Sequence, residues 1–161
     1  MSAKLTKVMT LIMLIGCFSI MSLTVNAAGP RDGEIVDGSL LTSNQTATNE
    51  FQIAARGAIL ASGMSSITHQ GLGTIYISGK TYAFQECNSI SATIYLERLE
   101  GDAWVYVTQR AYSGADVYLA SGGVLLTLQR HCYYRLRGTH RAQRGNISES
   151  GLTLTDGIYI E

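Results

Sequence analysis

The basic side chains of this sequence are concentrated in one short stretch near its C-terminal end. Residues 133–146, YYRLRGTHRAQRGN, hold four arginines and one histidine, whereas the whole chain has three lysines. Arginine presents a planar fork of N–H donors that fits carboxylate and phosphate groups and also stacks on aromatic rings. The stretch is therefore either a grip for an anionic ligand or the solvent-facing side of a β-strand.

Alternation of side chains along a strand separates these two interpretations. One face of a strand over 132–141 suits an apolar core and carries Tyr134, Leu136, Gly138 and His140. The opposite face suits water and carries Tyr133, Arg135, Arg137, Thr139 and Arg141. What looks like a basic cluster is then a stripe along one side of a strand.

A hairpin over 90–110 supplies neighbours for this stripe. Its first strand alternates apolar and polar residues, and a loop centred on 100–101 places Leu96 opposite Val105 and Ile94 opposite Val107. The same register sets two further pairs opposite each other, Glu97 with Trp104 and Tyr95 with Tyr106. A slip of one residue would mix the two faces, so this register is the one we predict.

These residues define a candidate ligand face at Tyr95, Trp104, Tyr106, Arg135 and Arg137. Exposed tyrosine and tryptophan beside arginine suit the stacking of sugars or the binding of acidic glycans and peptides. The same residues also satisfy one another, because Glu97 and the rings offer partners to both arginines. A solvated, aromatic-rich sheet face without a ligand is the favoured interpretation of the two.

Sequence motifs for catalysis or metal binding do not occur. His69, His131 and His140 lack the spacing of a metal site, and G-x-S-x-G, C-x-x-C and H-E-x-x-H are absent. We expect His140 to be a hydrogen-bonded packing residue and Glu149 to accept hydrogen bonds from backbone. We therefore assign no catalytic residue, no metal and no cofactor.

Cys87 and Cys132 are the cysteines that follow the N-terminal apolar run. An oxidising compartment permits a disulfide between them. An up-and-down order of the strands instead sets them at opposite ends, which would leave both thiols free. Both outcomes stay open at this point.

Short runs of β-branched and aromatic residues recur from residue 51 onward, roughly every 8 to 15 positions, with glycine between them. The expected strands are 55–61, 65–68, 73–78, 80–86, 90–99, 103–110, 117–119, 124–128, 132–141 and 152–160. No stretch carries the periodicity of an amphipathic helix. The pattern predicts an all-β protein, an antiparallel two-sheet β-sandwich of immunoglobulin-like layout over 51–161.

Two segments precede this domain. Residues 28–50 are polar and rich in turn formers, which predicts a flexible N-terminal segment with a short strand near Leu40. Residues 1–27 predict a signal peptide, because Lys4 and Lys7 precede an apolar run and VNA ends at Ala27. The alternatives are an uncleaved membrane anchor and lipidation of Cys17 in LIGC.

Cleavage after Ala27 removes two lysines and leaves ten basic against twelve acidic residues. This balance gives no general attraction to nucleic acid or to anionic lipid. We therefore expect a secreted protein without a nucleic-acid partner, in which membrane contact is confined to the leader.

The hairpin and residues 133–161 resemble small secreted proteins of Gram-positive bacteria. The shared motifs are L-x-R-L at 96–99, G-x-x-W at 101–104, Y-R-L at 134–136 and G-T-H at 138–140. The resemblance extends from about residue 33 to the end. It implies an uncharacterised family with a domain of unknown function, a β-sandwich fold and export, and it supplies no catalytic residues.

Taken together, these features predict a secreted, non-enzymatic binding or surface-interaction module with a cell-surface glycan or protein as its partner. One alternative is a small secreted hydrolase of glycan or peptide substrates, which would need a cleft where catalytic side chains converge. Another is an inhibitor protein that binds its partner through a sheet edge.

Overall fold

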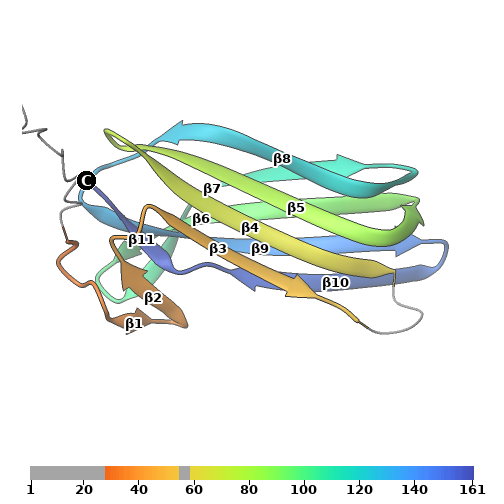
Figure 1. Cartoon of the computed structure of the whole chain (residues 1–161), viewed down its shortest axis with the longest axis horizontal. Coiled ribbons are helices and arrows are strands. Elements are labelled where there is room, and N and C mark those ends of the chain that lie inside the picture. Colours follow the sequence, from red (N-terminus) through yellow and green to blue (C-terminus); the bar gives the residue numbers. More distant parts are fainter. Residues whose placement is uncertain (1–27, 55–58) are drawn as a thin grey trace, which may run out of the picture.

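Alternating burial along long strands builds the architecture of this chain. In the strand β5 (Thr74–Cys87), Ile75 and Ile77 are fully buried, whereas Tyr76 and Phe84 on the other side are exposed. Such alternation means that one face of the sheet packs on a core and the other meets water. The computed structural model describes residues 28–54 and 59–161, and these form two packed sheets (Figure 1).

The smaller sheet has four strands in the order β3-β4-β5-β8. Besides β5, this sheet contains β3 (Thr46–Gln52), β4 (Leu60–Gly71) and β8 (Val117–Thr127). The larger sheet has seven strands, in the order β1-β2-β11-β9-β6-β7 with β10 also beside β9. These are β1 (Ile35–Val36), β2 (Ser39–Thr42), β6 (Ser89–Glu100), β7 (Ala103–Gly114), β9 (Cys132–Arg144), β10 (Ile147–Leu154) and β11 (Gly157–Ile160).

The predicted all-β, two-sheet sandwich is confirmed. The pairings between described strands are antiparallel except that of β2 with β11, which is parallel. The strand at 132–141 lies between its predicted neighbours, with β6 on one side and the last two strands on the other. Across 28–54 and 59–161 we find no helix with the length and apolar character to span a membrane.

Several predicted turns are in fact strand interior. The runs 73–78 and 80–86 are one strand, β5, and the runs 117–119 and 124–128 are one strand, β8. We took these glycines as signs of turns, but they lie within strands and leave space for side chains of the opposite sheet. A Cβ at Gly79 would lie 2.4 Å from Ile94, and one at Gly122 would lie 2.2 Å from Tyr112.

The predicted last strand, 152–160, is two strands with a break at Thr155 and Asp156. A single strand over 152–160 would place the even-numbered residues Leu152, Ile158 and Ile160 on one inward face. Ile158 and Ile160 are buried in this way, but the break changes which side faces the core, so Leu152 is 70% exposed.

The hairpin register is also wrong by two residues at the turn. The observed pairs are Leu99 with Trp104 and Glu97 with Tyr106, because the loop is the tight Gly101–Asp102 turn. A bulge between Leu96 and Glu97 then shifts the register again. As a result Val105 and Val107, which we expected to be buried, are each 39% exposed.

Residues 28–50 are ordered into strands rather than flexible, since β1, β2 and most of β3 lie there. Residues 1–27, including the predicted signal peptide and Cys17, lie outside the described residues, as do the first positions of the strand predicted at 55–61. Cys87 and Cys132 are free thiols. Cys87 ends β5 beside the late part of β9, whereas Cys132 begins β9, so they lie at opposite ends of that strand.

A chain of buried hydrogen bonds crosses the core at His140. The Nδ1 atom lies 2.8 Å from the Thr81 hydroxyl and the Nε2 atom lies 3.0 Å from the Thr153 hydroxyl. Thr81 donates its own hydrogen to the Ser91 carbonyl at 2.9 Å. It therefore accepts from His140, which places a proton on Nδ1, and burial keeps the imidazole neutral, so that Nε2 is an acceptor. Thr153 then donates to Nε2 and accepts from Ser65 at 2.6 Å.

Two glycines create the space for this chain. A Cβ at Gly63 would lie 2.3 Å from the His140 ring, and one at Gly138 would lie 2.2 Å from the Ser65 hydroxyl. The expectation that His140 is a hydrogen-bonded packing residue is thus confirmed. Burial lowers its pKa from 6.5 to about 4.

The depressed pKa of His140 predicts a loss of stability in mild acid. Its neutral form stabilises the fold fully above about pH 6.5, and that contribution is lost as the pH falls towards 4. We expect about 3 kcal/mol of unfolding free energy to disappear over this interval because of His140. Urea unfolding at stepped pH would measure the loss.

The matched control is His140→Gln, which should flatten this part of the pH profile. An NMR titration of the wild-type imidazole gives the pKa directly and does not depend on the variant folding. A pKa near 6.5 would contradict the assignment.

Candidate functional site

The arginine stripe predicted from the sequence is centred on a buried carboxylate, Glu97. Arg135 donates from Nε to one carboxylate oxygen at 2.9 Å, and Arg137 donates from Nε to the other at 2.9 Å. Residue exposure is only 4% for Arg135 and 6% for Glu97. A pair so deeply buried needs every charged atom to be bonded.

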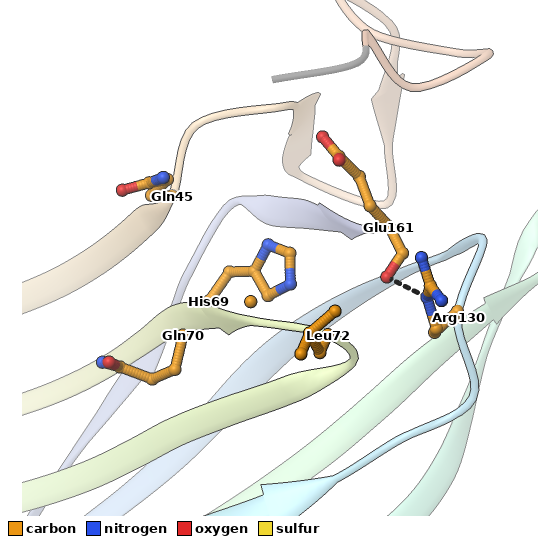
Figure 2. Close-up of a pocket in the computed structure, with 7 residues that line it drawn as sticks. Gln45, His69, Gln70, Leu72, Arg130 and Glu161 are labelled. Carbon is orange, nitrogen blue, oxygen red and sulfur yellow. Dashed lines mark hydrogen bonds between the residues drawn. The ribbon is translucent and has the colours of Figure 1, made fainter. Parts of the chain in front are cut away.

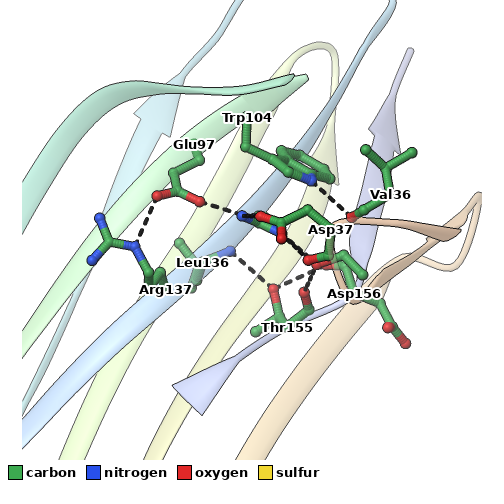
Figure 3. Close-up of polar contacts among 10 residues, drawn as sticks. Val36, Asp37, Glu97, Trp104, Leu136, Arg137, Thr155 and Asp156 are labelled. Carbon is green, nitrogen blue, oxygen red and sulfur yellow. Dashed lines mark hydrogen bonds and ion pairs between the residues drawn. The ribbon is translucent and has the colours of Figure 1, made fainter. Parts of the chain in front are cut away.

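The hairpin of β1 and β2 supplies the missing bonds (Figure 3). Arg135 donates to the Asp37 carbonyl at 2.8 Å, to the Asp37 carboxylate at 2.9 Å and to the Ser39 hydroxyl at 3.0 Å. Its guanidinium also lies 4.4 Å from the centre of the Trp104 ring. Trp104 in turn donates to the Val36 carbonyl at 3.0 Å. The arginine is therefore sealed beneath the hairpin.

The sequence does contain a signal for this cover, which we missed. Asp37 and Gly38 have φ of 47° and 77° and form the two-residue turn between β1 and β2. An Asp-Gly pair between apolar residues is the commonest short-range sign of such a hairpin. Recognising it would have placed a cover over part of the predicted ligand face.

The structure thus brings all five predicted residues together around Glu97, but four of them have little free surface for a ligand. The Trp104 ring is covered by Arg135, and the Tyr95 ring is covered by Arg137, whose guanidinium lies 4.6 Å from its centre. The fifth, Tyr106, pairs with Glu97 and is 57% exposed. This face is therefore structural.

The outer face of the four-stranded sheet is the better candidate. It was not evident in the sequence, because the short strands expected at 73–78, 80–86, 117–119 and 124–128 are in fact the two continuous strands β5 and β8. Hydroxyl, glycine and aromatic residues point outward there, a composition that also suits antibody binding loops. We call it the tyrosine face and define it as Met64, Tyr76, Ser78, Lys80, Tyr82, Phe84, Tyr118, Ser121 and Gly123.

Tyr76 lies down on the sheet at Gly123 of the neighbouring strand. A Cβ at Gly123 would fall 2.0 Å from the Tyr76 hydroxyl oxygen and 2.4 Å from the ring carbon that bears it. The ring thus occupies the space of the absent side chain, and 40% of the residue stays exposed. Within the described residues no cation or second aromatic ring stacks on Tyr76, and its exposure on the wall of a hollow leaves part of the ring accessible to a ligand.

A second group of aromatic residues lies further along β5. Tyr82 stacks on Tyr118 with ring centres 6.2 Å apart, and Phe84 is 55% exposed beside them. Tyr76 and Tyr82 are six residues apart on one strand, a span of about 20 Å. An extended ligand along β5 could contact both groups.

Two shallow hollows occupy this face. One of about 250 Å³ is lined by Tyr76, Ser78, Lys80 and Ser121 together with the backbone of the glycines. The other, of about 440 Å³, lies beside Tyr82 and Phe84. Aromatic walls with a few hydroxyls and one cation are the usual lining of a ligand site.

A third, more polar hollow of about 370 Å³ lies at the end of the sandwich (Figure 2). His69 borders it, and its Nε2 atom is buried without a hydrogen-bond partner. Arg130 at its rim donates to the main-chain oxygen of Glu161 at 2.5 Å. This arginine is already engaged by the chain itself, so we rank the hollow below the tyrosine face.

Comparison with known proteins identifies one related family. A family model described as "Family of unknown function (DUF6147)" matches residues 32–157, which is most of the chain. No curated protein matches the sequence.

The network around Glu97 predicts unequal roles for its two arginines. Arg135→Met leaves a buried carboxylate with one partner fewer, so we expect a loss of about 3–5 kcal/mol in unfolding free energy. Arg137→Met removes a side chain that is 46% exposed and should cost at most about 1 kcal/mol. Chemical denaturation of both variants measures the difference, and equal losses would contradict the buried assignment of Arg135.

Proposed function

The chain belongs to the DUF6147 family of unknown function, and we propose that it is a non-enzymatic binding module that holds a carbohydrate chain on its tyrosine face. The observation that carries the proposal is the ring of Tyr76, which lies on Gly123 with an open face above a hollow lined by hydroxyls. Sugars pack their C–H faces on such rings and bond their hydroxyls to nearby polar side chains.

The arrangement along β5 supports a chain rather than a single sugar. The open ring of Tyr76 lies six residues along β5 from Tyr82, which stacks on Tyr118, and Ser78 and Lys80 lie between them. A ligand that spans both aromatic groups gains contact area without any deep pocket. The opposite sheet lacks this arrangement, because Arg135 and Arg137 cover the rings of Trp104 and Tyr95.

Binding to immobilised oligosaccharides tests the proposal. We expect Tyr76→Ala to weaken binding about tenfold, since stacking on an aromatic ring contributes about 0.5–1.5 kcal/mol and further contacts depend on it. Gly123→Ala keeps the tyrosine but pushes its ring off the sheet, so it should also weaken binding. The glycan should be recovered at its original length, whereas shortened products would favour a hydrolase.

The matched control is Tyr106→Ala, which removes an exposed tyrosine from the other sheet and should leave binding unchanged. An unchanged unfolding midpoint shows that each variant is folded. Binding that survives Tyr76→Ala and Gly123→Ala would overturn the assignment of this face.

We propose further that the protein acts outside the cell, on the ground of the leader predicted over 1–27. Expression with the native leader should release a protein that begins at Ala28 into the medium, and its intact mass measures the cleavage point. A retained leader, or a lipid on Cys17, would contradict simple secretion.

A further inference from the structure

Lys80 is the single lysine among the described residues, and it lies in the middle of the tyrosine face. Its ammonium nitrogen is 4.5 Å from the centre of the Tyr82 ring. A ring at that distance attracts a cation and holds it in place, but it carries no negative charge with which to neutralise it. The ammonium therefore retains its capacity to bind an anion.

No carboxylate of the described residues forms an ion pair with Lys80. The acidic residue nearest on this face is Glu50, which pairs with Met64, and Met64 pairs with Lys80. Glu50 is therefore two strands from Lys80, a backbone separation of about 10 Å. Its carboxylate accepts a hydrogen bond from Gln52 instead.

This unpaired cation contrasts with the arginines of the opposite sheet. Arg135 and Arg137 both form ion pairs with Glu97, so their positive charges have an acidic partner within the protein. Lys80 stands among hydroxyls and glycines, with Ser78 and Ser121 beside it and the open ring of Tyr76 bordering the same hollow. A cation without an acidic partner between two aromatic groups points to a negative charge on the ligand.

We propose that the tyrosine face selects anionic carbohydrate chains, in which a carboxylate or a phosphate pairs with Lys80 while sugar rings stack on Tyr76. This inference rests on the proposed function and adds the charge of the ligand. The shared chemistry is one negative group per bound segment, carried by a uronic acid or by a phosphorylated sugar. The serine hydroxyls donate to the remaining oxygens of that group.

The experiment compares three probes on the full chain: neutral cello-oligosaccharide, oligogalacturonate and phosphorylated oligomannose. We expect both anionic probes to bind about fivefold more tightly than the neutral one, the gain of a partly exposed ion pair. Lys80→Met retains the alkyl stem and should abolish this preference, so that the anionic and neutral probes bind the variant with equal affinity. Lys80→Arg should restore it. At an ionic strength of about 1 M the preference should shrink, because the Debye length falls to about 3 Å.

The outcomes separate this inference from the proposed function. Tighter binding of either anionic probe that is lost in Lys80→Met supports it, and the probe with the larger gain identifies the anionic group. Equal binding of all three probes that Tyr76→Ala weakens would overturn the preference for anions and leave the glycan site standing. If none of the probes binds, the proposed function and this inference both fail.

Discussion

The alignment of the two sheets depends on the hydrogen-bond chain through His140. Two apolar sheet faces can slide over one another at little cost, whereas a buried hydroxyl or imidazole without its partner costs about 1–3 kcal/mol. The chain joins Ser65 and Thr81 of the smaller sheet to Thr153, His140 and Ser91 of the larger one. A shift of either sheet would break several of these bonds at once. The polar chain therefore selects one alignment, and the apolar core around it supplies most of the stability.

With the sheets aligned in this way, the two outer faces have different uses. On the larger sheet, the β1–β2 hairpin packs over Arg135, and its Asp37 completes the set of bonds that a buried guanidinium needs. The outer face of the larger sheet thus binds the N-terminal strands β1 and β2. On the smaller sheet, no described strand packs over Tyr76 and Lys80, which leaves aromatic rings and one cation accessible. The arginine-rich strand β9 therefore contributes a structural cluster rather than a ligand site.

Local alternation predicted the sandwich, the side of β9 that faces the core, and the gathering of Tyr95, Trp104 and two arginines around Glu97. These follow from the period of two residues alone. The opposite side of β9 was expected to meet water, but Tyr133 and Arg135 on it are buried because the N-terminal strands β1 and β2 pack there. The sequence could not show that Gly79 and Gly122 lie within strands, because what requires a glycine there is a side chain from the opposite sheet. The tyrosine face was missed for the same reason. Its central feature, a ring resting on a glycine of another strand, depends on pairing between residues far apart in the sequence.

The two adjacent glycines of β8 would ordinarily make this edge strand weak, since glycine adds backbone freedom and contributes no side chain. Here Tyr112 of β7 covers Gly122 from within the sandwich, and Tyr76 of β5 covers Gly123 from outside. The strand is clamped between two rings that belong to other strands, an arrangement known to compensate for glycine at sheet edges. Side chains of neighbouring strands thus supply the rigidity that the glycines of β8 lack. A molecule that binds to the Tyr76 ring therefore also contacts the edge of the sheet through that ring.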